Sequence, residues 1–195
     1  MVERLMKEGL LAELNHDNLP NFKNVEAYAK TRTFDAESKY SVPYMWGTLG
    51  IVYNTTLVDD PVDSWEILWN EKYAKKIMMY DSIRDTMAVA LLRLGYSINT
   101  TDEQELAEAG ELLTEQKELV LAWETDAIKD SMAGGGVALA VDYSGAAAAA
   151  IMENADLEYV LPKEGSNVWV DNLVILKSSK NQKAAETFLN YLMDT

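Results

Sequence analysis

The sequence has 195 residues, of which 48% are hydrophobic, and a formal net charge of −15 at pH 7. This length accommodates one ordinary domain, or one domain with parts of a second. The excess of acid argues against binding to nucleic acid and to anionic membrane surfaces, because both attract clustered Lys and Arg. A cationic partner is favoured only weakly, since much of the charge lies between residues 102 and 118, where a solvated helix face explains it.

The chain contains no Cys and a single His, His16, which lies in a polar stretch. This composition excludes a disulfide framework, a thiol nucleophile and a nitrogen-rich metal cluster. No calcium-loop spacing is present, and no apolar run approaches the ~20 residues that cross a bilayer. We therefore expect no cofactor and no bound metal.

The chain opens with a helix that ends near Gly9, and a polar, irregular segment continues to Ser38. A helix at the first residue indicates that the chain begins inside a domain. Extended runs are predicted over residues 40–46 and 49–53, and beyond them strands and helices alternate. Helices are predicted over residues 64–70, 84–94, 101–116, 126–132, 144–152 and 182–193, and strands over 76–80, 119–123, 137–141, 157–161 and 168–176.

This alternation predicts an α/β fold. Continuous apolar strands such as residues 137–141 are typical of a mostly parallel sheet that is flanked by helices and buried on both faces. Ligands of such sheets bind at the carboxyl ends of the strands, near a topological switch point. That rule selects residues 80–85, 123–124 and 142–144 as the candidate ligand-binding edge.

Aromatic and acidic residues occur together at these strand ends. Residues two apart in a strand face the same side, so Trp169 and Asp171 present an indole face and a carboxylate to one neighbour. An organic ammonium suits both, because it forms charge-assisted hydrogen bonds and cation–π contacts. Core packing explains any one pair alone, but three pairs occur: Tyr80 with Asp81, Asp142 with Tyr143, and Trp169 with Asp171.

Five runs of the sequence form a recognisable set: Lys7–Leu10, Ser41–Gly47, Leu94–Thr101, Leu161–Gly165 and Trp169–Leu173. Together they resemble the spermidine/putrescine-binding proteins of bacterial polyamine importers. The resemblance implies a periplasmic-binding-protein fold of type II, in which two lobes close around a polyamine by a hinge motion. Residues 1–47 then form part of the first lobe, residues 48–169 the second lobe, and residues 170–195 a return segment to the first.

The resemblance also implies the ligand-binding residues. Trp169 and Asp171 match the family's W-x-D motif, which binds an amine, and Tyr143 stands where the family commonly has Trp. The family pattern D-x-x-E, with Arg before the Glu, corresponds here to Ser82 through Asp85. Asp85 thus replaces the longer acid and Ser82 the first one, so we expect one charge contact to be missing or supplied by Asp81. This departure favours a diamine such as putrescine over spermidine.

The family further implies a location outside the cytoplasmic membrane, with a possible lipid anchor, and delivery of the polyamine to the permease subunits of an ABC importer. A chain that holds only part of the first lobe is expected to bind ligand poorly. Such a fragment would expose the surface that the rest of that lobe covers, and a dimer of the fragment would be unsurprising.

A binding protein of the same fold for an anionic solute is the nearest alternative, because the N–H groups of a helix that begins at Ser144-Gly145 can hold an anion. Asp142 beside them argues against this, and no Lys or Arg lies between residues 137 and 152. Arg84 is the one cation near a predicted strand end, and we expect it to pair with Asp81 or Asp85.

An enzyme and a purely structural module are the remaining alternatives. Paired aspartates can serve as acid and base, as in glycoside hydrolysis, but no spacing in this sequence singles out such a pair. The sequence contains no nucleophile elbow, phosphate loop or metal motif, so we expect no catalysis. A structural module predicts that the aromatic rings are all buried, and exposure of Tyr143 and Trp169 counts against it.

Overall fold

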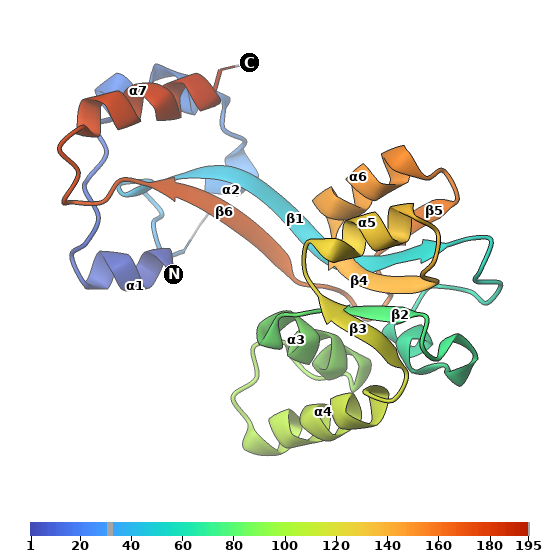
Figure 1. Ribbon diagram of the computed structural model, residues 1–195. Coiled ribbons are helices and arrows are strands. Elements are labelled where there is room, and N and C mark those ends of the chain that lie inside the picture. The colour runs from blue at the N-terminus through green and yellow to red at the C-terminus, as the bar shows by residue number, and fades with distance from the viewer. Residues whose placement is uncertain (31–32, 195) are drawn as a thin grey trace. The chain divides into compact units, whose positions relative to one another are not determined.

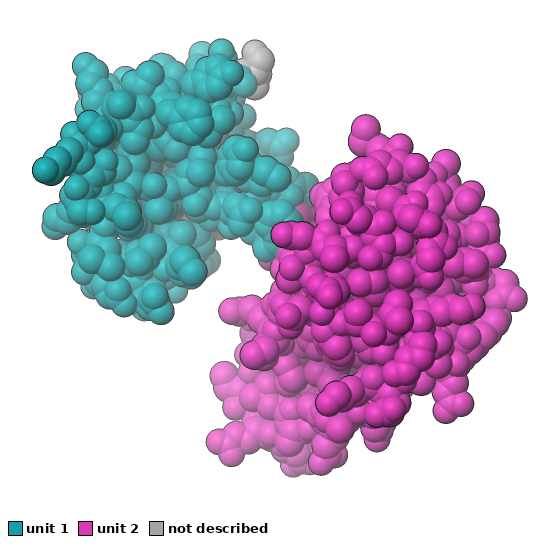
Figure 2. All heavy atoms as spheres, in the orientation of Figure 1, with its two compact units in different colours: residues 1–46, 169–195 teal, residues 47–168 magenta. Residues whose placement is uncertain are grey.

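The computed structural model describes residues 1–30 and 33–194. Residues 31–32, in the segment predicted to be irregular, and residue 195, at the end of the predicted return segment, lie outside the described residues. The chain forms two compact units, one of residues 1–46 with 169–195 and one of residues 47–168 (Figure 2). That these units are the two lobes of a binding protein stays a prediction.

A mixed sheet forms the centre of the second unit. Its strand order is β3-β2-β4-β1-β5, and β6 pairs with β1. β2 is parallel to β3 and β4, whereas β1 is antiparallel to β4 and β5. The α/β fold class is confirmed, and the sheet is mixed where we predicted a mostly parallel one, because an apolar run shows that a strand is buried but not which way it points. The strands are β1 (Ser41–Asn54), β2 (Ile77–Tyr80), β3 (Val120–Glu124), β4 (Leu139–Tyr143), β5 (Leu157–Val160) and β6 (Val168–Val174).

Helices flank this sheet (Figure 1). In the second unit, α3 packs against α4 and the 3-10 segment η3, while α5 packs against α6. Among the described residues, no helix combines the length and the hydrophobicity needed to cross a bilayer. The helical segments of this unit are η3 (Trp65–Trp69), η4 (Glu71–Tyr73), α3 (Ile83–Arg93), α4 (Glu103–Gln116), α5 (Ala127–Ala133) and α6 (Ser144–Glu153).

The alternation of side chains along the strands divides the core of the second unit into two clusters. Ile51 of β1 packs in one cluster with Trp65 of η3 and the fully buried Val89 of α3. Its neighbour Val52 packs in the other with Ile128 of α5 and Ala147 of α6. Successive residues of a strand point to opposite faces, so one buried strand supplies both clusters.

Three local predictions need correction. The two extended runs form one continuous strand, β1, with Pro43 inside it, and the helix predicted over residues 64–70 is the 3-10 segment η3. The helix predicted from residue 101 begins at Glu103 and is capped by Asp102, whose carboxylate accepts hydrogen bonds from two backbone N–H groups of the first turn. A carboxylate is a strong acceptor at this position, and it also interacts favourably with the positive end of the helix dipole.

The first unit is built around a separate small core, to which α7 contributes Leu189 and β1 contributes Val42. Glu186 of α7 is buried, and its carboxylate accepts hydrogen bonds from the backbone of Asn15 and from the Gln182 side chain, both at 2.9 Å. The bond from Asn15 ties α7 to the N-terminal segment. The helical segments of this unit are α1 (Val2–Lys7), η1 (His16–Asn18), η2 (Pro20–Asn24), α2 (Ala27–Lys30) and α7 (Gln182–Leu192).

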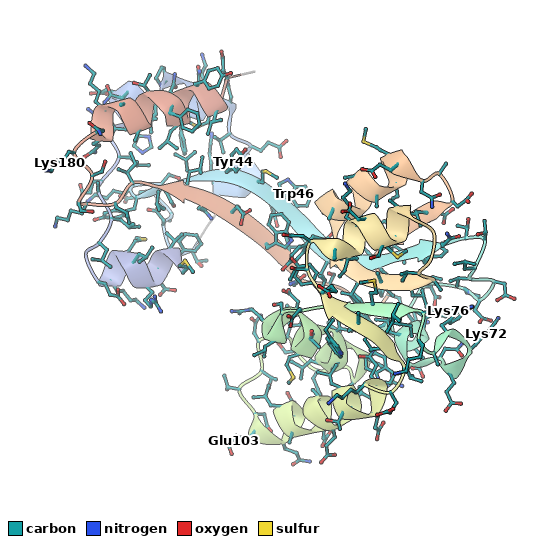
Figure 3. All side chains as sticks on the ribbon, in the orientation of Figure 1. Tyr44, Trp46, Lys72, Lys76, Glu103 and Lys180 are labelled. Atoms are coloured by element: carbon teal, nitrogen blue, oxygen red, sulfur yellow. The ribbon has the colours of Figure 1, made fainter. Side chains whose placement is uncertain are left out.

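Two aromatic side chains of the first unit are exposed on β1. Tyr44 and Trp46 are 51% and 58% exposed, and Figure 3 labels both on this strand. The ring of Trp46 makes an edge contact with Tyr28, with 6.3 Å between the ring centroids. Residues two apart in a strand share a face, so the two rings line one side of β1.

Candidate functional site

The carboxyl ends of two parallel strands form one edge of the sheet in the second unit. β2 pairs in parallel with β4, so the residues that follow both strands lie at this edge. β1 is antiparallel to β4, and its Leu49 pairs with Tyr143 at the same edge. The helices α3 and α6 begin directly beyond the two strands. The predicted ligand-binding residues 80–85 and 142–144 are therefore brought together, although they are about 60 positions apart in the chain.

Asp85 lies at the centre of this edge, in the first turn of α3. Its side chain is only 6% exposed, and each carboxylate oxygen accepts a hydrogen bond. Tyr143 Oη donates to Oδ2 at 2.8 Å, and Asn167 Nδ2 donates to Oδ1 at 2.7 Å. A buried carboxylate with good partners on both oxygens is held in one orientation. Asp85 is thus a fixed negative charge beside an aromatic ring.

Tyr143 links β4 to α3 through this bond. Its ring is half-buried and packs against the ring of Tyr80, with 4.7 Å between the centroids. Burial raises the pKa of the Tyr143 phenol well above its usual range, and the hydrogen bond to Asp85 raises it further. The phenol therefore keeps its proton at neutral pH and remains the donor to Asp85.

Ser82 and Asp81 have different surroundings from Asp85. Ser82 is the N-cap of α3, and its hydroxyl accepts a hydrogen bond from the backbone N–H of Asp85 at 3.4 Å. Asp81 is exposed, and its backbone N–H donates to the carbonyl of Glu124. Among the described residues, Arg84 forms no ion pair with Asp81 or Asp85, so the pairing that we predicted for it is wrong. Both Arg84 and Asp81 point charge toward solvent at the start of α3.

Asp142 faces away from Tyr143, because neighbouring strand residues point to opposite sides of the sheet. It is 2% exposed, and its Oδ1 accepts a hydrogen bond from the backbone N–H of Tyr143 at 2.7 Å. Burial raises the pKa of Asp142 to about 6, repulsion from Asp126 adds to this, and the N–H bond opposes it. The prediction that Asp142 and Tyr143 act on one ligand as a pair is corrected: Tyr143 pairs with Asp85.

We expect Asp142→Asn to change how the stability of the chain depends on pH. The folded-state pKa of Asp142 lies above its unfolded value of 3.8, so the native carboxylate loses stability as pH rises between about 4 and 6. At pH 7.5 the variant should therefore be more stable than the native chain by about 1 to 3 kcal/mol, and at pH 4 the two should be alike. Urea unfolding across this range measures the difference.

The exposed Asp81→Asn provides the matched control for removing one negative charge from this edge. If the free energies of unfolding of the native chain and of Asp142→Asn change in parallel with pH, the raised pKa of Asp142 is contradicted. The phenols of Tyr80, Tyr143 and Tyr159 also interact with the Asp142 charge, and all three titrate well above this range because their pKa values are raised.

Trp169 and Asp171 lie on β6, in the first unit. Asp171 is exposed and Trp169 is half-buried. The two residues are separated by one position of the strand, so they share a face as predicted from their spacing. Half-exposure of Trp169 and of Tyr143 counts against a purely structural module.

A family model described as bacterial extracellular solute-binding protein matches residues 1–195. The chain belongs to this family. It is 34% identical to the spermidine/putrescine-binding periplasmic protein of Salmonella typhimurium over 193 residues, which cover 98% of this chain and 56% of that protein. The putrescine/agmatine-binding protein of Pseudomonas aeruginosa is 30% identical, with 97% of this chain and 57% of that protein covered.

A solved structure supports the same assignment for this solute-binding protein. The spermidine/putrescine ABC transporter substrate-binding protein of Streptococcus pneumoniae superposes with a TM-score of 0.87 and 38% identity, covering 100% of this chain and 60% of the other. The fold of the family is thereby confirmed. The chain spans between half and two thirds of the length of the relatives that it matches.

Asn167 is the contact of this site that we did not predict. It immediately precedes β6 and carries no motif of its own, so only its distance to Asp85 reveals it. The neighbouring Ser166 explains its placement, because the Ser166 hydroxyl donates a hydrogen bond to the carbonyl of Leu49. This bond holds the segment before β6 at the edge where Leu49 pairs with Tyr143.

No group of three or more His, Cys, Asp or Glu side chains suited to a metal ion occurs in the part of the chain that the structure describes. The chemistry available at the edge in this solute-binding protein is instead that of acceptors beside aromatic rings. Carboxylate oxygens and ring faces both attract an organic cation, and the methylenes of such a ligand can pack on the rings.

Proposed function

We propose that this chain is part of the substrate-binding component of an ABC importer that captures polyamines, with spermidine and putrescine as its ligands, and delivers them to the permease subunits. The component acts outside the cytoplasmic membrane, in the periplasm or at the outer face of the cell. It performs no chemical reaction on the ligand. The names of the relatives from Salmonella typhimurium and Pseudomonas aeruginosa support the ligand class.

The observation that carries the proposal is the fixed, buried carboxylate of Asp85 beside the ring of Tyr143. Two donors hold the Asp85 oxygens, which retain lone pairs for a further donor. An ammonium brings both a positive charge and N–H donors, and the half-exposed Tyr143 ring offers its face to the methylenes. An anion would meet the Asp85 carboxylate at this edge, which repels it.

Trp169 and Asp171 complete the proposed set of ligand-binding residues with Tyr143, Asp85, Ser82 and Asp81. In this proposal Trp169 packs on the methylenes and Asp171 binds a second amine. Ser82 accepts one hydrogen bond but does not neutralise charge, so Asp81 supplies the additional negative charge. This arrangement favours putrescine over spermidine.

Calorimetric titration of the complete gene product tests the proposal. We expect saturable binding of putrescine and spermidine that weakens at high salt, since the contacts are charge-assisted. The matched control is 1,4-butanediol, which has the same carbon chain as putrescine but no charge, and it should not bind. Binding of sulfate without any heat from amines would overturn the polyamine assignment in favour of an anionic solute.

A further inference from the structure

Asn167 presents an acceptor oxygen next to the carboxylate that we propose as an amine-binding group. We infer that Asn167 binds the ligand directly, its Oδ1 accepting a hydrogen bond from the ammonium group that Asp85 neutralises. This inference rests on the proposed function and adds a residue that determines which amines are accepted. It is carried by the orientation, the burial and the surroundings of the Asn167 amide.

The orientation of the amide is determined by its partner. Asp85 Oδ1 lies 2.7 Å from Asn167 Nδ2, and a carboxylate oxygen carries no proton and can only accept. The NH₂ group of Asn167 must therefore face Asp85, and the amide carbonyl points away from it. The polarity of the amide is thus set by the structure.

The carbonyl oxygen is buried and unpaired. Asn167 Oδ1 is shielded from solvent and has no hydrogen-bond partner among the described residues. Leaving a shielded acceptor without a donor costs about 1 to 3 kcal/mol. The residue as a whole is half-exposed, as are Tyr143 and Ser82 around Asp85, so a ligand has a side from which to approach.

Ser82 and Tyr143 are both already engaged in hydrogen bonds with Asp85. Ser82 Oγ accepts from the backbone N–H of Asp85, and the Tyr143 hydroxyl donates to the Asp85 carboxylate. Among the described residues no group donates to Asn167 Oδ1, so a bound ligand can supply the donor. An ammonium provides three N–H donors, which suffice for Asp85 and Asn167 at once, whereas a quaternary ammonium provides none.

The same geometry predicts selectivity for the hydrogen-bonding capacity of the amine. Putrescine and its fully N-methylated, bis-quaternary analogue carry equal charge on the same four-carbon chain. Attraction to the Asp85 charge and to aromatic rings acts on both ligands, but only putrescine can donate to Asn167. Asn167→Leu keeps the size of the side chain and removes its hydrogen bonds.

Calorimetry on the complete gene product, together with a crystal structure of its putrescine complex, tests the inference. We expect Asn167→Leu to weaken putrescine binding about 10- to 100-fold, as for a hydrogen bond to a charged group. Binding of the bis-quaternary analogue should change much less, so preference for putrescine over the analogue falls. In the crystal structure an ammonium nitrogen should lie about 2.9 Å from Asn167 Oδ1.

The exposed Asn99→Leu is the matched control and should leave both affinities unchanged. Asn167→Ser, which is too short to reach Asp85 or the ligand, repeats the test if the leucine variant does not fold. A complex in which Asn167 Oδ1 does not contact the amine, or an Asn167 variant with unchanged putrescine affinity, overturns this inference alone. A native protein that binds no amine overturns the proposed function and this inference together.

Discussion

Replacement of Trp169 or Asp171 by alanine should weaken polyamine binding about 30-fold or more in the complete gene product. A large aromatic ring packed on a ligand, and a charge paired with it, are the contacts whose truncation typically costs 2 kcal/mol or more. Both residues lie on β6 and share one face of the strand. Calorimetric titration with putrescine and spermidine measures the loss for each variant.

Tyr191→Ala and Asp17→Ala are suitable controls, because both residues belong to the first unit, are exposed, and lie outside β6. These variants should bind as the native protein does. The loss for Asp171→Ala should shrink at high salt more than the loss for Trp169→Ala, since only the former removes a charge. If both β6 variants retain native affinity, the residues implied by the W-x-D resemblance do not bind the ligand.

Asp85→Asn should abolish most of the amine affinity, by about 30-fold or more, and should also destabilise the second unit. The variant removes the buried charge. In the native chain Tyr143 and Asn167 each donate to an oxygen of Asp85, and in the variant one of them faces an NH₂ group instead. A buried donor left without its acceptor costs about 1 to 3 kcal/mol. Calorimetry measures the affinity, and urea unfolding of the 195-residue chain measures the stability.

Asp81→Asn removes the same charge four positions earlier, at an exposed residue, and should reduce amine affinity far less and leave stability unchanged. The reverse order, with Asp81 more important than Asp85, would mean that the exposed acid takes over the charge contact entirely. Asp85→Glu alone should bind weakly, because the longer acid displaces the Tyr143 hydroxyl. Adding Tyr143→Trp removes this hydroxyl and should restore part of the affinity.

This coupling follows from two departures that the sequence shows separately. The resemblance places Tyr143 where the family commonly has Trp, and Asp85 where it has a longer acid. The structure joins them, because the Tyr143 hydroxyl reaches the shorter carboxylate at 2.8 Å. Each substitution alone would weaken the site, whereas together they keep a charged group in contact with an aromatic residue.

Much of the fold was predictable because its signals are local. Turn residues, apolar runs and helical periodicity place β2 to β6 and α3 to α7 close to their observed positions. The cap of α4 at Asp102 and the continuity of β1 through Pro43 were not predicted. Several adjacent polar residues can cap a helix, and the differences in free energy between them are too small for the sequence pattern to decide. Whether a strand continues through a proline likewise depends on the hydrogen bonds that its neighbours form.

By itself, the sequence determined the family, the α/β class and the candidate residues at the strand ends, since motifs and periodicity are properties of neighbouring residues. Only the tertiary structure decided which of those residues meet. It turned Asp142 to the opposite face from Tyr143, paired Tyr143 with Asp85, and added Asn167 from a segment about 80 positions away. Strand direction and register govern these contacts, and both arise from the packing of distant segments, for which no local signal exists.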